Sequence, residues 1–159
     1  MKGDTKVIEF LNQQLTGELT AINQYFLHAK MQENLGWSKL AEHTKAESID
    51  EMRHAEALTD RILFLAGLPN YQRLGTLHIG QSASEMFEAD MRLEVEAVTL
   101  LRDGIAHMRQ VGDTTSARLF EGILQDEEHH IDYLETQLAL IQQLGEALYL
   151  AKHVDPPTG

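Results

Sequence analysis

The sequence predicts an all-α fold, a bundle of four long helices followed by a short fifth helix. Three observations carry this prediction. Glycine (11) and proline (3) are sparse, and the prolines stand only at positions 69, 156 and 157, so long stretches contain no helix breaker. Hydrophobic residues make up 43% of the chain but aromatic residues only 6%, which is typical of helices packed through leucine, isoleucine and alanine. A length of 159 residues suits one domain.

Apolar residues recur at the helical period in four long segments and one short one. We therefore expect helices over residues 5–35, 38–65, 83–110, 114–143 and 145–153. Glycines mark the expected helix ends at Gly36, Gly67, Gly112 and Gly145. Residues 1–153 form the predicted domain, and residues 154–159 form a predicted flexible tail because they have nothing to bury.

Polar residues that favour helix N-termini precede three of these segments. Ser38 and Asp113 are expected to cap the second and fourth helices. The sequence from Ser82 to Glu85, Ser-Ala-Ser-Glu, predicts a capping box at the start of the third helix.

The connection over residues 67–82 is too long for a tight turn and too apolar for a disordered linker. Fully extended at ~3.3 Å per residue it spans about 50 Å, whereas a helix of this length class measures about 42 Å. The segment can therefore run along the whole bundle, which makes the second and third helices parallel. One long crossover of this kind is the topology of ferritin-like folds.

A spacing of glutamate and histidine occurs twice in the chain, with gaps of 33 and then 3 residues. The two sets are Glu18, Glu51 and His54, and Glu94, Glu127 and His130. In each set a glutamate on one helix is followed by Glu-x-x-His on the next. This pattern is a recognised ligand set of carboxylate-bridged two-metal sites in four-helix bundles.

Each of the four glutamates interrupts an otherwise apolar helix face, as Glu18 does between Leu15 and Ile22. Each also lies roughly 20 Å from one end of its expected helix, so the four meet at mid-height. Four ionised carboxylates in an apolar core are prohibitively costly unless cations neutralise them, and two divalent ions would do so. The sequence therefore predicts a two-metal site at the centre of the bundle.

The available ligands narrow the choice of metal. The chain has no cysteine, so thiolate sites and disulfides are excluded. Oxygen ligands with one histidine per metal suit iron or manganese, with zinc as a competitor. Six groups shared by two metals leave open positions, which on a redox-active pair predict chemistry with oxygen or peroxide.

Five further polar residues lie near these ligands in the sequence. We expect them to be solvated or to support the ligands, and binding of iron elsewhere by Glu47 or Asp50 stays open. The five are Glu47, Asp50, Asp126, Glu128 and His129.

The formal net charge of −12 disfavours nucleic acid and anionic membranes as partners. The N-terminal residues contain no apolar run typical of a signal peptide, and no stretch reaches the ~18 apolar residues of a membrane span. We therefore expect a cytoplasmic protein.

Several stretches of the chain resemble bacterioferritins, and the resemblance extends to about residue 150. Other ferritin-like families share the metal ligands but not these flanking sequences. The stretches are MKGDTKVI at the N-terminus, Ala21–Ala29, Glu47–Ala55, Arg61–Leu65 with Gly67–Asn70, and Asp126–Glu135.

The resemblance implies a ferroxidase centre inside each subunit, formed by the six glutamates and histidines above and holding two iron ions. It also implies a hollow shell of 24 identical subunits, built from two-fold dimers, that stores ferric mineral. Apolar residues of the crossover and the last helix are expected at contacts between subunits. They are Leu74, Leu77, Ile79, Leu148 and Tyr149.

The same resemblance assigns Met52 as the axial ligand of a b-type haem that two subunits share. Met52 follows Glu51 by one residue and so points about 100° away from the metal core. Some bacterioferritins bind iron on the cavity wall through a histidine and an aspartate, but this chain retains Asp50 and has Ala46 where that histidine would be. The role of Tyr25, as electron donor or as hydrogen-bond donor to a ligand, stays open, as does an electron-donor protein for iron release.

Three functions are compatible with these patterns. The first is an iron-storage ferroxidase that oxidises Fe(II) with oxygen or peroxide. The second is a two-metal oxidase or peroxidase acting on an organic substrate as a monomer or dimer. The third is a DNA-protecting starvation protein, which builds its iron site between subunits. The complete ligand set within one chain and the negative charge favour the first over the third.

Overall fold

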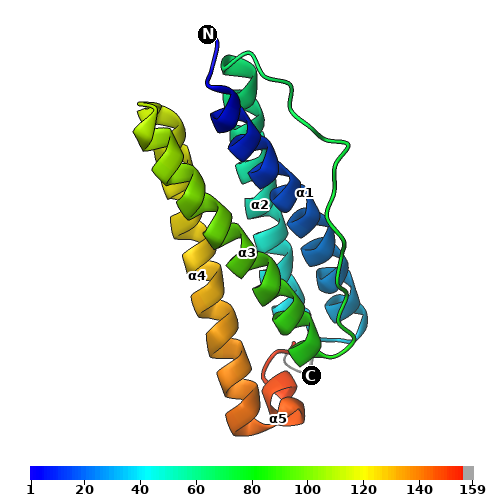
Figure 1. Cartoon of the computed structure of the whole chain (residues 1–159). Coiled ribbons are helices and arrows are strands. Elements are labelled where there is room, and N and C mark those ends of the chain that lie inside the picture. Colours follow the sequence, from blue (N-terminus) through cyan, green and yellow to red (C-terminus); the bar gives the residue numbers. More distant parts are fainter. Residues whose placement is uncertain (156–159) are drawn as a thin grey trace.

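The computed structural model describes residues 1–155, and within them the chain forms five α-helices. They are α1 (Thr5–Asn34), α2 (Ser38–Phe64), α3 (Ala83–Gln110), α4 (Thr114–Leu144) and α5 (Glu146–Ala151). The four long helices form an elongated bundle in which α1 packs against α2 and α3, and α3 packs against α4 (Figure 1). The predicted all-α bundle is confirmed. Most of the predicted flexible tail, residues 156–159, lies outside the described residues.

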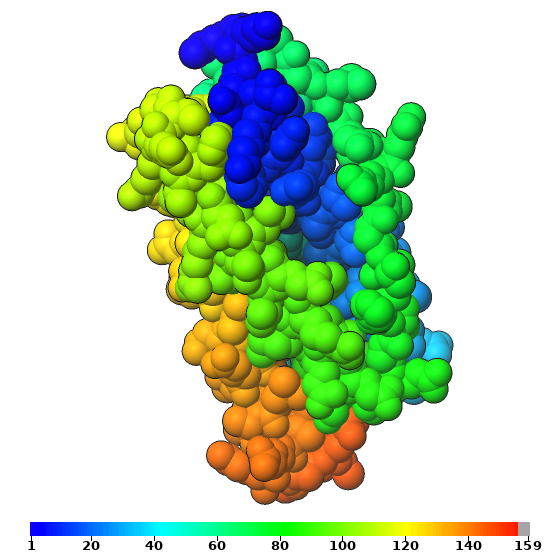
Figure 2. Space-filling model, viewed as in Figure 1, coloured from blue at the N-terminus to red at the C-terminus, as the bar shows by residue number. Residues whose placement is uncertain are grey.

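The segment between α2 and α3 runs along the whole bundle beside α1 (Figure 1). Consequently α2 and α3 point in the same direction, as the length of this segment predicts. On the space-filling surface it forms a continuous ridge next to α1 (Figure 2). Its apolar side chains Leu74, Leu77 and Ile79 are exposed in the single subunit.

Side chains of α1 hold this crossover in place by bonding its backbone. Four of these side chains accept from backbone N–H groups, and they recur at multiples of four residues, so they share one helix face. The pairs are Asn70 N to Asn12 Oδ1 (2.8 Å), Gly75 N to Thr20 Oγ1 (2.8 Å), His78 N to Gln24 Oε1 (3.0 Å) and Gly80 N to His28 Nε2 (3.0 Å). The crossover is therefore fixed without forming regular secondary structure.

Two of the three predicted N-caps are confirmed and one is wrong. Asp113 caps α4 and Ser82 caps α3, although the Glu85 carboxylate bonds the amide of Gln81 instead of that of Ser82. Ser38 is the first residue of α2, and the cap is Trp37, whose carbonyl accepts from the amide of Ala41. The tight turn before α2 explains the difference. A capping residue must lie just outside the helix, and the chain is already helical at Ser38.

The helix ends use glycine in two different ways. Gly36, Gly112 and Gly145 have φ angles of +86°, +83° and +80°, which favour glycine. At the end of α2 the residue with positive φ is instead Ala66 (+61°). Gly67 is needed there for close packing, because a Cβ at this position would lie 2.8 Å from the side chain of Ile8.

The apolar core consists of two clusters on either side of a polar layer at mid-height. The larger cluster includes Leu11, Leu58, Leu101 and Phe120, and the smaller one joins α5 to the bundle through Tyr149. Tyr149 is 1% exposed and its hydroxyl donates to Gln137 Oε1. The expectation that Tyr149 offers apolar surface for a subunit contact is therefore wrong, because its own chain buries it. An aromatic ring from the short helix α5 therefore fills the end of the bundle.

Candidate metal centre

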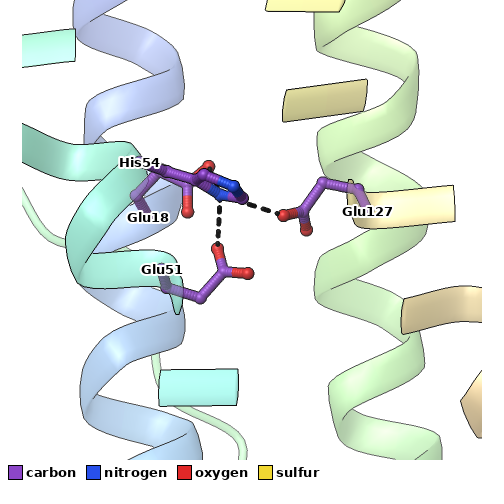
Figure 3. Close-up of side chains that lie close together, drawn as sticks. All are labelled: Glu18, Glu51, His54 and Glu127. Carbon is purple, nitrogen blue, oxygen red and sulfur yellow. Dashed lines mark ion pairs between the residues drawn. The ribbon is translucent and has the colours of Figure 1, made fainter. Parts of the chain in front are cut away.

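The polar layer contains all six predicted ligands, and every one is buried. Glu18 comes from α1, Glu94 from α3, and the two Glu-x-x-His pairs from α2 and α4. A spacing of three residues puts the glutamate and histidine of each pair on the same helix face. Figure 3 shows Glu18, Glu51 and His54 facing Glu127 across the bundle.

The six side chains form two groups that share two members. One group is Glu18, Glu51, His54 and Glu127, and the other is Glu51, Glu94, Glu127 and His130. Within each group one ligand atom from every residue lies within 4.8 Å of the others. Glu51 and Glu127 belong to both groups, so their two oxygens are placed to bridge two ions.

The histidine Nδ1 atoms mark the two positions. His54 Nδ1 lies 3.4 Å from Glu18 Oε1 and 3.3 Å from Glu127 Oε1. His130 Nδ1 lies 3.3 Å from Glu51 Oε1 and 3.4 Å from Glu94 Oε1. We call the group with His54 the first metal position and the group with His130 the second metal position.

The charge balance of the layer fits divalent cations. The four glutamates are between 1% and 2% exposed, and no lysine or arginine among residues 1–155 forms an ion pair with them. Five buried polar atoms of the layer, four from the glutamates and one from a histidine, have no hydrogen-bond partner, an arrangement that metal coordination would satisfy. These atoms are Glu18 Oε2, Glu51 Oε1, His54 Nδ1, Glu94 Oε2 and Glu127 Oε1.

Without cations the layer retains protons. Burial, together with the charge of Glu18, raises the pKa of Glu51 well above its usual range, and burial also raises the pKa of Glu127. Burial alone would lower the pKa of His54, but the carboxylates of Glu127 and Glu18, which face its ring, outweigh burial and raise that pKa. Binding of metal must therefore displace protons from this layer.

Three surrounding residues hold the ligands in place. Gln14 Nε2 donates to Glu18 Oε1 (2.8 Å), the Tyr25 hydroxyl donates to Glu94 Oε1, and His54 Nε2 bonds Asp126 Oδ2 (2.7 Å). The sequence analysis missed Gln14, although it stands four residues before Glu18 on the same helix face. Of the two open roles of Tyr25, the hydrogen bond to a ligand is present.

The other polar neighbours of the ligands mostly lie at the surface, as expected. Asp50 pairs with Arg53, Glu128 pairs with Arg102, and His129 is exposed. Glu47 is the exception, because it is 6% exposed and bonded by His43 Nε2 at 2.6 Å. Its side chain faces the inside of the bundle, and the stacking of His43 on Tyr133 explains how the pair is accommodated.

A second buried polar cluster was not predicted. The carboxylate of Asp90 accepts from Gln24 Nε2 (2.8 Å) and from His28 Nδ1 (2.9 Å), joining α1 to α3. The spacing of residues so far apart in the chain does not predict such a contact. The cluster supports the crossover, since Gln24 and His28 also bond its backbone.

The metal layer opens on two sides. A cavity of about 440 Å³ between α1, α3 and the crossover reaches Glu18, Glu51, Glu94 and Glu127. On the opposite side, an opening is lined by the rings of the two ligand histidines and by four further residues. These are Asp50, Arg53, Asp126 and His129. We call this second opening the histidine-side opening.

Met52 points away from the metal layer, as its place in the sequence predicts. Its side chain is 46% exposed and lines a shallow apolar depression with Leu19, Ile22 and Tyr71. Phe26 and Ile49, from the same two helices, are also exposed. A surface of this kind is available for contact with another subunit or a planar apolar ligand.

This fold and this layer together define a four-helix bundle with a buried layer of glutamate and histidine side chains that could hold metal ions. Residues 8–144 match the family model described as "Ferritin-like domain". The chain is 66% identical to the bacterioferritin of Streptomyces coelicolor, covering 98% of this chain and 93% of the relative. It is 62% identical to bacterioferritin BfrA of Mycobacterium tuberculosis, covering 99% and 100%.

Solved structures agree with these similarities. "The structure of Mycobacterial bacterioferritin" superposes with a TM-score of 0.98 at 62% identity, covering 100% of this chain and 99% of that one. The chain belongs to the bacterioferritin family. Family membership supports a role in iron storage within a multi-subunit assembly, and the buried glutamate and histidine groups are compatible with iron binding. No helix among the described residues is long and apolar enough to cross a membrane.

Proposed function

We propose that the protein is a ferroxidase that oxidises Fe(II) to Fe(III) with oxygen or peroxide and stores the ferric product inside a shell of 24 subunits in the cytoplasm. The observation that supports this most strongly is the set of six buried ligands. It is complete within one chain and has four carboxylates that no lysine or arginine among residues 1–155 neutralises.

Each ligand has a defined role in this proposal. Glu18 with His54, and Glu94 with His130, bind one iron ion each. Glu51 and Glu127 bridge the two ions, since they belong to both groups. The iron pair supplies the electrons that reduce the oxidant, while the carboxylates offset the added positive charge of Fe(III).

The residues around the ligands prepare them for this reaction. Gln14 and Tyr25 each engage one oxygen of a terminal glutamate and leave the other oxygen free for iron. The cavity between α1, α3 and the crossover provides a path for iron and oxidant from outside. The histidine-side opening provides a second path, by which ferric ions leave the layer.

The proposal includes a b-type haem between two subunits, held by Met52 from each. The exposed sulfur-bearing side chain and the apolar depression around it support this assignment. An electron-donor protein that releases stored iron would transfer electrons through such a haem. Residues 1–153 act as one structural unit in this assembly.

Size and iron retention together test the proposal. The purified protein is expected to scatter light as a particle many times larger than its 18.0 kDa chain. When Fe(II) is added in air, the ferric product should stay soluble and elute with the protein. A monomer or dimer that releases its iron as a precipitate would favour an oxidase acting on an organic substrate instead.

A further inference from the structure

The two halves of the bundle repeat each other at a constant offset, and this holds beyond the ligands. Glu94, Glu127 and His130 each lie 76 residues after Glu18, Glu51 and His54. Two further pairs of residues follow the same offset and lie at the histidine-side opening. They are Asp50 with Asp126, and Arg53 with His129. The first pair is identical in the two halves, whereas the second is not.

In the first metal position the aspartate supports the ligand. His54 directs Nδ1 toward the glutamates and donates from Nε2 to Asp126 Oδ2 at 2.7 Å. A carboxylate in this place fixes the ring orientation and makes the other nitrogen a better metal ligand. Asp126 forms no ion pair with lysine or arginine in the part of the chain described, so its carboxylate is available to His54.

In the second metal position the equivalent aspartate, Asp50, pairs with an arginine and not with the histidine ligand. Asp50 Oδ1 accepts from Arg53 Nη1 at 2.9 Å, one helical turn along α2. No side chain among residues 1–155 forms a hydrogen bond with His130 Nε2. In the other half His129 takes the place of Arg53, and it forms no ion pair with Asp126.

The cation of Arg53 has two consequences for the second metal position. It neutralises Asp50, the carboxylate that would otherwise support His130. It also puts a positive charge at the opening that both histidine rings line. The first effect weakens cation binding beside His130 and has no counterpart in the first metal position, where no arginine pairs with Asp126. The second effect acts at both positions.

From this difference between the halves we propose that the two metal positions have unequal affinity. The first metal position fills first and holds its ion tightly, and the second exchanges its ion through the histidine-side opening. Asp126 and Arg53 are the positioning residues that set this order. The inference rests on the proposed two-metal centre and adds an order of filling to it.

The expected effects differ in size. Loss of a hydrogen-bonding partner behind a histidine ligand typically weakens metal binding by about 10- to 100-fold. Arg53 and Asp50 are largely exposed, with side chains 74% and 46% accessible, so their ion pair is screened by water. Removing Arg53 should therefore change binding at the second metal position by only several-fold.

Titration of the metal-free protein with Co²⁺, followed by calorimetry and by the visible absorption of the ion, tests the proposal. The wild-type protein should bind two ions per subunit in two resolved steps. Glu94→Gln should retain the tight step and Glu18→Gln should lose it, because each removes a terminal ligand of one position. These two variants assign the steps without reference to iron oxidation.

Three further variants test the positioning residues. Asp126→Asn should weaken the tight step by about 10-fold or more, and Arg53→Gln should tighten the weaker step. Arg53→Lys keeps the positive charge and should behave like the wild type. Glu128→Gln removes an exposed carboxylate from the same turn of α4 and serves as the matched control.

Equal affinities in the wild type, or an Asp126→Asn variant that weakens the step assigned to His130, would overturn the inference. Arg53→Gln with both steps unchanged would also overturn it. A wild-type protein that binds no Co²⁺ would instead contradict the two-metal centre itself, so the two failures are distinguishable.

Discussion

The hydroxyl of Tyr25 on α1 donates a hydrogen bond to Oε1 of Glu94 on α3, across the centre of the bundle. Burial, with the charges of Asp90 and Glu51 nearby, raises the pKa of Tyr25 well above its usual range, so the phenol stays protonated. This bond ties a proposed metal ligand to the opposite helix pair. Its removal tests whether Tyr25 orients that ligand.

Tyr25→Phe should leave Glu94 Oε1 with only the 3.4 Å contact to His130 Nδ1, at a cost of about 1–3 kcal/mol to the metal-free protein. The thermal midpoint of unfolding should fall, and the Co²⁺ absorption at the second metal position should change. Tyr149→Phe is a matched control, because Tyr149 is also buried and donates to Gln137 far from the metal layer. An identical Co²⁺ spectrum in Tyr25→Phe would contradict an orienting role.

Glu94→Ala should abolish rapid oxidation of Fe(II), because the second metal position loses its terminal carboxylate. The metal-free variant should remain folded, because weaker repulsion among the buried carboxylates opposes the loss of the Tyr25 hydrogen bond. Stopped-flow absorbance measures the oxidation and calorimetry the unfolding. Glu88→Ala, an exposed change on the same helix, should alter neither. Unchanged oxidation in Glu94→Ala would locate the chemistry elsewhere.

Met52→Leu should give a folded protein that lacks the absorption of haem with two methionine ligands. Leucine conserves volume and polarity but has no sulfur ligand. Oxidation of Fe(II) should largely survive, because Met52 points away from the metal layer. Met91→Leu, a change on a different helix, should retain the haem. Normal haem content in Met52→Leu would refute the assignment.

The stability of the metal-free protein should fall as the pH rises. Glu51 and Glu127 have raised pKa values in the folded state, so their contribution is complete below their ordinary pKa of 4.5 and is lost as the pH rises through the folded values. His54, whose pKa is raised from 6.5, contributes with the same sign. Thermal midpoints measured from pH 5 upward check this.

Two comparisons isolate the metal layer in that experiment. Glu51→Gln removes one titrating carboxyl group and should show a shallower dependence on pH. Zn²⁺ replaces the lost protons and should raise the midpoint most at high pH. A midpoint independent of pH in the metal-free wild type would show that the layer does not take up protons.

Periodicity alone was enough to predict which residues line the bundle. A glutamate such as Glu18 or Glu94 within an apolar helix face must point toward the core, so the residues of the metal layer could be predicted from the sequence. The length of the crossover likewise determined that α2 and α3 are parallel.

Contacts between distant residues could not be predicted in this way. The bond from His28 to Asp90 joins positions 62 residues apart, and no spacing rule connects them. Glu47 was expected either to be solvated or to support the ligands, and its burial against the ring of His43 could not be predicted from the sequence. Ser38 is not the cap because α2 already begins at Ser38, which leaves Trp37 in the cap position.

The way α1 holds the crossover has a consequence for how this family can diversify. The α1 side chains recognise backbone amide hydrogens of the crossover, such as those of Gly75 and His78, and every residue type except proline carries one. The path of the crossover is therefore set through its backbone, and its own side chains matter where it packs closely, as at Gly80, where a Cβ would lie 2.3 Å from the backbone nitrogen of Met86. Positions such as Leu74 and Leu77, which are exposed in the single chain, can therefore change in evolution while the bundle beneath stays the same.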